Sequence, residues 1–382
     1  MRILQVIEFL TPQMCGSPMV AYQISRHLAQ RGHEVTVVTS DYGTSRFPQE
    51  PFRVIYLPNL VARWGFYVTP ALFRWARQNL PDFEIIHLHT ARTFQNIVVS
   101  HYARRYGLPY LLQAHGTLPV IAARKVAKRL YDLMFGRRVV AGARGMIAVS
   151  EMERQQYRQF GVPAEKISLV PNGLDLEEFS HLPVRGSYRS QHHIAEGVAV
   201  ILSVGRIHQL KGLHHLIRAF ARLQKVRPDT LLIIAGPDEG DQPRLEKLVA
   251  THGLQGSVRF PGPFYGKQKL AALVDADVVT STSYYEIFGL VPFEALLCGA
   301  PVVVSQQIAS GKLIAALNAG YLAPYGDEDA LCASLIDVLS HPEEALRRVA
   351  SGQAYIRQHL SWQAIIEQIE QLYAFHVGQM DQ

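Results

Sequence analysis

The sequence has 382 residues, too many for one ordinary core and enough for two domains. Hydrophobic residues make up 48% and charged residues 18%, a globular composition that excludes a disordered chain. No apolar run reaches the roughly 18–20 residues that cross a bilayer, so no membrane-spanning helix is predicted. Cys15, Cys298 and Cys332 lie far apart, which excludes a disulfide framework and a thiolate metal site and fits a reducing cytoplasm.

The net charge of +6 is concentrated in one stretch of the chain. Residues 101–144 contain nine Lys or Arg and a single acid, Asp132, so this stretch carries +8 and the rest of the chain −2. A concentrated basic surface attracts anionic lipid, nucleic acid or a phosphorylated substrate. Composition leaves these three partners open.

Short β-branched runs alternate with helical patterns through most of the sequence. The first run, in MRILQVIEFL, is interpreted as a strand rather than a signal peptide because it contains Glu8 and lacks a small-residue cleavage site. Most runs are apolar on both faces, as parallel strands covered by helices on each side must be. The pattern predicts α/β doubly wound sheets. The predicted strands are Ile3–Ile7, Val35–Thr39, Val54–Leu57, Ile85–Leu88, Tyr110–Gln113, Met146–Val149, Val200–Val204, Leu231–Ala235, Val258–Phe260, Val278–Ser281 and Val302–Val304.

The strands form two series, which predict Rossmann-like domains at residues 1–178 and 198–360. Residues 179–197 are polar and without a period, so we interpret them as a linker. Residues 361–382 are predicted to form a helix that packs its isoleucines toward the first domain. Two such domains would face each other across a central cleft at the carboxyl ends of their strands, where α/β sheets bind ligands.

The strongest local signal runs from Ser281 to Pro301, STSYYEIFGLVPFEALLCGAP. A helix is predicted to begin near Leu290, and free N–H groups at a helix start suit a diphosphate. Glu286 and Glu294 lie eight residues apart, so that one carboxylate can reach sugar hydroxyls while the other accepts from a ribose. The alternative is that both are ordinary surface acids. Glu294 argues against it, because it lies among apolar residues, where a carboxylate needs a partner.

This Glu-x7-Glu stretch, followed by CGAPVVVS, resembles the retaining family-four glycosyltransferases of the GT-B fold, which include bacterial mannosyl- and glucosyltransferases. The resemblance extends over nearly the whole chain. It implies a GT-B fold with an acceptor-side N-terminal domain and a C-terminal domain that binds the nucleotide sugar. The further stretches that carry it are GHEVTVVT at 32–39, HLHT at 87–90, AHGTLP at 114–119, VPNGLD at 170–175, VGRIHQLKGLHHLIRAFA at 204–221 and IIAGPDEGD at 233–241.

The resemblance assigns the residues that hold the donor diphosphate. Arg206 and Lys211 match the family's pair of cations, and two cations on one loop after a strand can offset this charge. The alternative is that Lys211 is a solvated helix residue, although a cation is disfavoured at a helix N-terminus. Gly16, Gly289 and Leu290 would contribute backbone groups. The family usually has a second glycine before Gly16, where this sequence has a cysteine.

The resemblance also assigns the residues around the sugar and the nucleoside. His115 and Glu286 would be catalytic, with His115 close to the sugar ring and Glu286 orienting donor hydroxyls. Glu294 would bind the ribose. The predicted nucleotide pocket consists of Gly205, Gly236 and Phe264.

Histidines are more often structural than functional, and this sequence has 16. His115 stands out because it directly follows a predicted strand and precedes Gly116. His87 and His89 either help fix the fold or line the acceptor side, and neither is assigned a role.

Three other patterns are excluded as sites. Gly262–Gln268 has three residues between its glycines instead of the four of a P-loop and no Ser or Thr after the lysine. No GxGxxG follows the first strand, which argues against a dinucleotide oxidoreductase. Asp275-Ala-Asp277 imitates a metal-binding pair but precedes a strand, so we interpret it as a helix-to-strand turn. No metal or other cofactor is expected.

The basic stretch includes a predicted amphipathic helix at Ala123–Val140. Its apolar face either packs into the first domain or lies with the cations on an anionic membrane surface. Nucleic acid is not expected, because no recognition motif accompanies the charge. The apolar residues are Val126, Leu130, Leu133 and Met134, and the basic ones Arg124, Lys125, Lys128 and Arg129.

The resemblance implies transfer of a hexose, with retention and without a metal, from a UDP- or GDP-linked donor to a hydroxyl of a glycan or lipid-linked acceptor. We expect such an enzyme in polysaccharide or glycolipid synthesis, in the cytoplasm or peripheral on the inner face of the membrane. The alternatives are a related sugar-nucleotide epimerase or phosphorylase, or a catalytically inactive transferase-like partner subunit.

Overall fold

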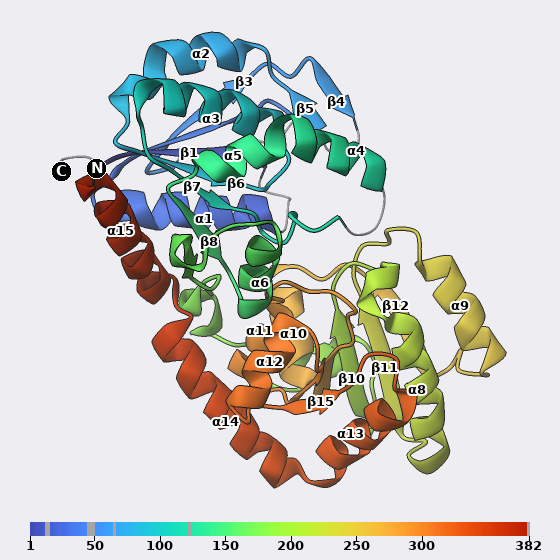
Figure 1. Ribbon diagram of the computed structural model, residues 1–382. Coiled ribbons are helices and arrows are strands. Elements are labelled where there is room, and N and C mark those ends of the chain that lie inside the picture. The colour runs from blue at the N-terminus through green and yellow to red at the C-terminus, as the bar shows by residue number, and fades with distance from the viewer. Residues whose placement is uncertain (12–15, 44–49, 64–65, 121–123, 380–382) are drawn as a thin grey trace. The chain divides into compact units, whose positions relative to one another are not determined.

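The computed structural model describes residues 1–11, 16–43, 50–63, 66–120 and 124–379. The chain forms two compact units, one of Met1–Gly173 with Trp362–Gln382 and one of Leu174–Ser361. Each unit has its own parallel sheet with helices around it (Figure 1). The predicted α/β class with two Rossmann-like sheets is therefore confirmed.

The first unit contains a seven-stranded sheet in the order β3-β2-β1-β6-β7-β8-β9, in which all pairs are parallel. Its strands are β1 (Arg2–Phe9), β2 (Glu34–Ser40), β3 (Arg53–Leu57), β6 (Ile85–His89), β7 (Tyr110–Gln113), β8 (Gly145–Ala148) and β9 (Ile167–Leu169). A separate antiparallel hairpin pairs β4 (Val61–Arg63) with β5 (Phe66–Val68). The helices are α1 (Ser17–Gln30), α2 (Ala71–Asn79), α3 (Phe94–Tyr106), α4 (Lys125–Tyr131), α5 (Arg137–Gly142), α6 (Glu151–Gln159) and α15 (Trp362–Gly378).

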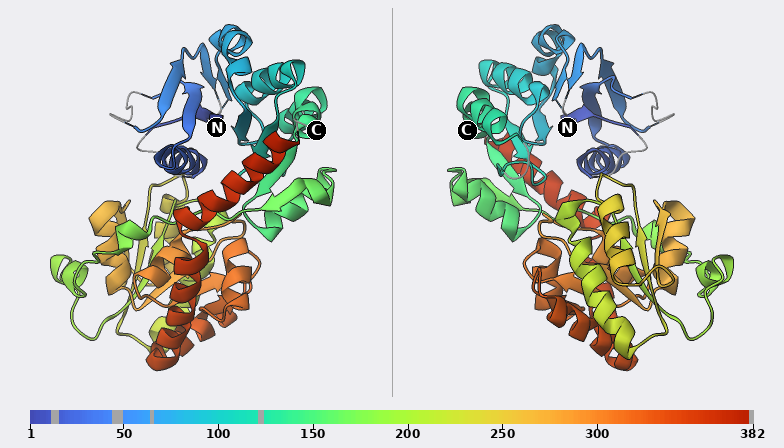
Figure 2. Two further views of the ribbon diagram at one scale, coloured as in Figure 1. Left: turned by 90° about the vertical axis from the view of Figure 1, so that its left-hand side faces the viewer. Right: turned by 90° about the vertical axis from the view of Figure 1, so that its right-hand side faces the viewer.

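The sheet of the first unit buries a separate apolar core on each face. Helices α2, α3, α5 and α6 cover one face, and α1 covers the other together with α15. Figure 2 shows α1 and α2 on opposite sides of these strands. Helix α15 contacts α1 and buries Ile365, Ile366 and Ile369, so the last helix does pack onto the first unit as predicted.

The second unit contains a six-stranded parallel sheet in the order β12-β11-β10-β13-β14-β15. Its strands are β10 (Ala199–Val204), β11 (Thr230–Ala235), β12 (Val258–Gly262), β13 (Val278–Ser281), β14 (Val302–Ser305) and β15 (Tyr321–Ala323). Its helices are α7 (Ser187–Gln191), α8 (Leu213–Val226), α9 (Gln242–Thr251), α10 (Gly266–Asp275), α11 (Val291–Leu297), α12 (Ala309–Ala316), α13 (Glu328–Ser340) and α14 (Pro342–His359). A core of strand residues with α8, α9, α13 and the start of α14 lies on one face.

Every predicted strand is present, with ends that differ by no more than two residues. The sequence did not predict β4, β5, β9 and β15, each only three residues long. Strands β9 and β15 lie at the ends of their sheets. A run of three residues shows no period, so only pairing with a neighbouring strand reveals it.

For residues 123–140, the interpretation in which the apolar face packs into the first domain is wrong. Ala123 lies outside the described residues, and the rest forms α4, a π-helical turn at Asp132–Gly136, and α5. Val126 is 80% exposed and Leu133 70% exposed. The opposite face is held inward by Asp132, which receives two bonds from Arg92 at 2.6 and 2.8 Å. None of the described helices is both long and apolar enough to cross a bilayer.

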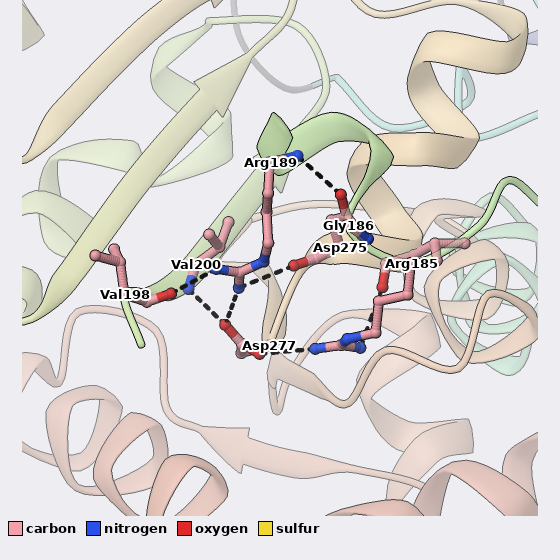
Figure 3. Close-up of polar contacts among 8 residues, drawn as sticks. Arg185, Gly186, Arg189, Val198, Val200, Asp275 and Asp277 are labelled. Carbon is pink, nitrogen blue, oxygen red and sulfur yellow. Dashed lines mark hydrogen bonds and ion pairs between the residues drawn. The ribbon is translucent and has the colours of Figure 1, made fainter. Parts of the chain in front are cut away.

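The segment at 179–197 carries α7 and is bonded to both carboxylates of Asp275-Ala-Asp277 (Figure 3). Asp275 accepts from the backbone N–H groups of Gly186 and Arg189 at 2.5 and 2.9 Å. Asp277 accepts from the guanidinium groups of Arg185 and Arg189 at 2.9 and 2.6 Å. Asp275 is the last residue of α10 and Asp277 directly precedes β13, which confirms the helix-to-strand turn. Its carboxylates fasten this segment to the second unit.

Replacing Asp277 tests this fastening. Asp277→Ala removes the partner of two guanidinium groups, one of them largely buried, and should lower the free energy of unfolding by about 2 kcal/mol. Asp329→Ala is the control, because its carboxylate is 87% exposed beside Arg222 and should contribute less than about 1 kcal/mol. Urea unfolding measures both variants. Equal losses would show that the Asp277 contacts are no stronger than a surface ion pair.

Candidate functional site

The second unit contains an open pocket at the carboxyl ends of β10 and β13. These strands are neighbours, but β10 leads to β11 on one side of the sheet while β13 leads to β14 on the other. Loops that leave such a pair diverge and open a crevice, the usual ligand position of α/β sheets. The predicted site residues that line the pocket are Gly205, Arg206, Lys211, Glu286, Gly289 and Leu290.

The two predicted diphosphate cations come from the single loop that joins β10 to α8. The ammonium of Lys211 forms an ion pair with the Glu286 carboxylate, and both side chains are three-quarters buried. Arg206 is more exposed, and its guanidinium lies 2.7 Å from the Glu239 carboxylate. Each cation therefore holds an internal carboxylate that an anionic ligand can replace.

Two glycines allow the backbone to approach closely here. Gly289 has φ +71°, and a Cβ on it would lie 2.8 Å from Cγ of Glu286 and 3.2 Å from Oγ of Ser310. A Cβ on Gly236 would lie 1.7 Å from the carbonyl oxygen of Gly205, so the loops after β10 and β11 touch backbone to backbone. Gly236 supports Gly205 from behind and is not among the pocket residues.

Glu294 lies in the first turn of α11 with its side chain 12% exposed. The partner that its burial requires is Lys269 of α10, whose Nζ lies 2.6 Å from Oε2. Burial raises the pKa of the nearby Glu178 carboxyl, as does Asp175, while Lys269 lowers it. Sequence analysis missed Lys269, because an isolated lysine on a surface helix gives no signal.

Phe264 lies away from the pocket lining. Its ring is buried and meets the ring of Tyr188 edge-on, with 5.6 Å between centroids. It therefore contributes to the packing of α7 in the second unit.

His115 and Gly16 belong to the first unit. His115 follows β7 with φ +52°, and its Nε2 lies 2.9 Å from Nδ1 of His89. Burial lowers the pKa of His115 to about 3, so its imidazole is neutral at physiological pH. Gly16 precedes α1 with φ +83°, and its carbonyl accepts from Val20 N–H. The preceding part of that loop, with Cys15, lies outside the described residues.

The first unit also holds two carboxyl groups that sequence analysis missed. Burial raises the pKa of Glu8 and of Glu153 to about 7. Glu8 accepts from Oγ1 of Thr90 at 2.8 Å, and Glu153 from the N–H groups of Gly116 and Val149 at 2.6 and 2.8 Å. A capping box starting at Ser150 could have revealed Glu153, because its fourth position is a glutamate. Within the described ranges, no group of three or more His, Cys, Asp or Glu is placed to hold a metal ion.

Comparison with protein families assigns both halves of the chain. Residues 15–178 match the model of Glycosyltransferase Family 4, and residues 184–355 match that of Glycosyl transferases group 1. The chain belongs to glycosyltransferase family 4. It is therefore a retaining transferase that uses nucleotide-sugar donors, and its two sheets are those of the GT-B fold.

Relatives of this family 4 glycosyltransferase match it over most of their length. It is 27% identical to a D-inositol 3-phosphate glycosyltransferase of Stackebrandtia nassauensis, over 91% of this chain and 84% of the relative. It is 28% identical to a phosphatidyl-myo-inositol mannosyltransferase of Mycobacterium leprae, over 98% and 96%. Anabaena HepE, solved with UDP, superposes with a TM-score of 0.81 at 22% identity over 98% of this chain and all of that one, and HepE has also been solved with UDP-glucose.

The depressed pKa of His115 predicts a pH-dependent stability. Between the unfolded pKa near 6.5 and the native value near 3, the unfolded chain binds a proton at this residue and the native chain does not. Stability from His115 is therefore present above pH 6.5 and is lost as the pH falls. His115→Gln cannot titrate, so the difference in unfolding free energy between wild type and variant should shrink between pH 7.5 and 5, by about 1.4 kcal/mol per unit below 6.5. A constant difference in urea titrations would contradict it.

Proposed function

We propose that this transferase moves a hexose from a UDP-linked donor to a hydroxyl of a glycan or lipid-linked acceptor in cell-surface polysaccharide or glycolipid synthesis. The observation that carries the donor site is the pairing of Lys211 with Glu286 beside Arg206 in the crevice between β10 and β13. HepE has been solved with UDP and with UDP-glucose, which favours uracil over guanine as the base of the donor.

The charges of the pocket support a role in stabilising the departing diphosphate. Negative charge grows on that group as its bond to the sugar breaks, and preorganised cations in a pocket stabilise it without a metal. Lys211 exchanges the Glu286 carboxylate for a phosphate oxygen when the donor binds. Glu286 is then free to accept from hydroxyls of the sugar. Gly289 and Leu290 along the same pocket, and Gly16 in the first unit, are proposed as the backbone contacts.

The nucleoside lies beside Gly205, with Gly236 behind it, in this proposal. Glu294 binds the ribose through the oxygen that Lys269 leaves free, because the ion pair at 2.6 Å occupies the other. Phe264 is left out of this nucleotide pocket, because its buried ring packs against Tyr188 of α7.

His115 contacts the sugar as a neutral imidazole. Since burial removes its charge, it exchanges hydrogen bonds with a hydroxyl instead of competing with Arg206 and Lys211 for the diphosphate. In this proposal the two cations bind the leaving diphosphate, whereas His115 and Glu286 orient the sugar.

Replacing Lys211 tests the donor site. UDP should raise the melting temperature of the wild type, and the rise should be lost in Lys211→Ala together with transfer, because the diphosphate loses its buried cation. Lys225→Ala, at the exposed C-terminal end of α8, should behave as wild type. GDP and ADP run beside UDP identify the base.

Three results would overturn parts of this proposal. Normal turnover by Lys211→Ala would remove the assignment of the cation. Conversion of the nucleotide sugar without any acceptor would indicate an epimerase. Failure of every nucleotide to bind would indicate an inactive partner subunit.

The exposed face of α4 and the π-helical turn supports binding to an anionic membrane surface. Val126 and Leu133 point away from the first unit, while Asp132, the only acid of the stretch, is neutralised on the inner side by Arg92. Cations at the rim of an exposed apolar face are typical of a helix that lies in a lipid interface. The exposed basic residues within 124–138 are Arg124, Lys125, Arg129, Arg137 and Arg138. Such a surface would bring the enzyme to a lipid-linked acceptor.

Vesicle sedimentation tests this surface. Leu133→Glu should reduce binding to vesicles of phosphatidylcholine and phosphatidylglycerol by at least about 10-fold, because a buried leucine contributes roughly 1.5–3 kcal/mol. Leu346→Glu, on the second unit with a 57% exposed side chain, is the control. Equal sedimentation of Leu133→Glu and wild type would exclude this face as the contact.

A further inference from the structure

A chain of polar side chains runs through the sheet of the first unit and ends at His115. From His115 Nε2 it passes to Nδ1 of His89 at 2.9 Å, and from Nε2 of His89 to Oε1 of Gln5 at 2.8 Å. Nε2 of Gln5 donates to Oη of Tyr373 at 3.0 Å, and that hydroxyl lies 2.7 Å from Nδ1 of His87. The hydrogen-bonded series therefore joins strands β1 and β6 and the loop after β7 to the C-terminal helix α15.

All members except His115 are fully buried. Gln5 lies on β1 among Leu4 and Val6, in a strand that is otherwise apolar through its buried length. Burying polar groups costs free energy even when they are bonded, and apolar side chains at these positions would pack without that cost. A fully bonded polar chain fixes one arrangement of its groups, which an apolar core does not. This hydrogen-bonded series of side chains therefore serves to hold its members in position.

The direction of each bond follows from the groups that can only donate or accept. Burial lowers the pKa of His87 and His115 to about 3 and that of His89 well below its usual value, so each ring carries one proton. The Gln5 carbonyl can only accept, so His89 holds its proton on Nε2. Nδ1 of His89 then accepts from Nε2–H of His115. Nδ1 of His115 is left with its lone pair.

The backbone at His115 is held by different groups. Its φ of +52° is sterically costly for a residue with a Cβ, and the surrounding structure must impose it. The N–H of Ala114 donates to Oη of Tyr157 at 2.7 Å, and that of Gly116 donates to Glu153 at 2.6 Å. With the backbone fixed on both sides, the remaining freedom of His115 is the position of its ring proton.

We propose that His89, Gln5 and Tyr373 are positioning residues that hold His115 in the tautomer with its proton on Nε2, so that Nδ1 accepts a hydrogen bond from a hydroxyl of the donor sugar. This rests on the proposed function for the contact between His115 and the sugar. It gives α15 a part in the reaction, because the Tyr373 hydroxyl accepts from Nε2 of Gln5, and this orientation of the amide turns its Oε1 toward His89. If that amide reversed, every bond to His115 would reverse, and Nδ1 would become a donor.

The test compares the loss of two buried tyrosine hydroxyls. Tyr373→Phe keeps the ring and frees the Gln5 amide to turn. Tyr110→Phe is the matched control, because its hydroxyl is equally buried in the same unit but bonds only the Val139 carbonyl at 2.6 Å. With a UDP-sugar donor, kcat should fall roughly 5- to 10-fold in Tyr373→Phe with little change in KM, and less than about 2-fold in Tyr110→Phe. Equal losses in the two variants would overturn the proposal.

Imidazole nitrogen NMR of histidine-labelled protein reads the tautomer directly, without any activity. The His115 signals are identified by their loss in His115→Gln. In the wild type Nδ1 should resonate as an unprotonated nitrogen, and in Tyr373→Phe it should move toward the protonated position. A protonated Nδ1 in the wild type, or an unchanged signal in Tyr373→Phe, would overturn the proposal.

Two further arms keep the result decisive. If Tyr373→Phe does not fold, Gln5→Met interrupts the same chain from β1 and should give the same shift of the His115 signal. If the wild type transfers no sugar, the proposed function fails, while the NMR measurement still decides whether the chain sets the tautomer.

Discussion

The donor pocket depends on the pairing of β10 with β13. These strands are parallel neighbours whose following chains leave in opposite directions, so a pocket opens at their carboxyl ends. The loop after β10 contributes Arg206 and Lys211, and the loop after β13 contributes Glu286 and Gly289. The two loops meet because β10 and β13 are adjacent at the point where the strand order reverses. If other strands lay between β10 and β13, the same loops would be too far apart to line one pocket.

The carboxylates of the second unit form a structural group and a functional group. The groups that each carboxylate bonds, more than its residue type, decide to which group it belongs. Each of the four carboxylate oxygens of Asp275 and Asp277 accepts from an N–H or guanidinium group of the α7 segment. Glu286 and Glu294 each face a single lysine within the donor half. A carboxylate with one mobile cation can exchange that cation for a substrate, whereas one fixed by several backbone and side-chain donors cannot.

The first unit shows the same division among its histidines. His87 and His89 are enclosed in the sheet and bonded within it, whereas His115, which is bonded to His89, is partly exposed. Helix α15 closes one face of this sheet with isoleucines and adds the hydroxyl of Tyr373 to the polar chain between those strands. One helix thus contributes both to the stability of the unit and to the geometry of its exposed imidazole.

The sequence by itself determined the α/β class, the position of every described strand longer than three residues, and the packing of the last helix onto the first unit. These follow from periodicity and apolar runs, which are local properties. It also placed Lys211 and Glu286 on loops after strands, and through a family resemblance connected them to one donor. Only the tertiary structure decided which groups pair. Gln5 and Tyr373 are 368 residues apart, and Lys269 meets Glu294 across two helices. Whether Val126 and Leu133 face the core or the solvent also lay beyond the sequence, because an amphipathic period fixes that a helix has two faces but not which one packs.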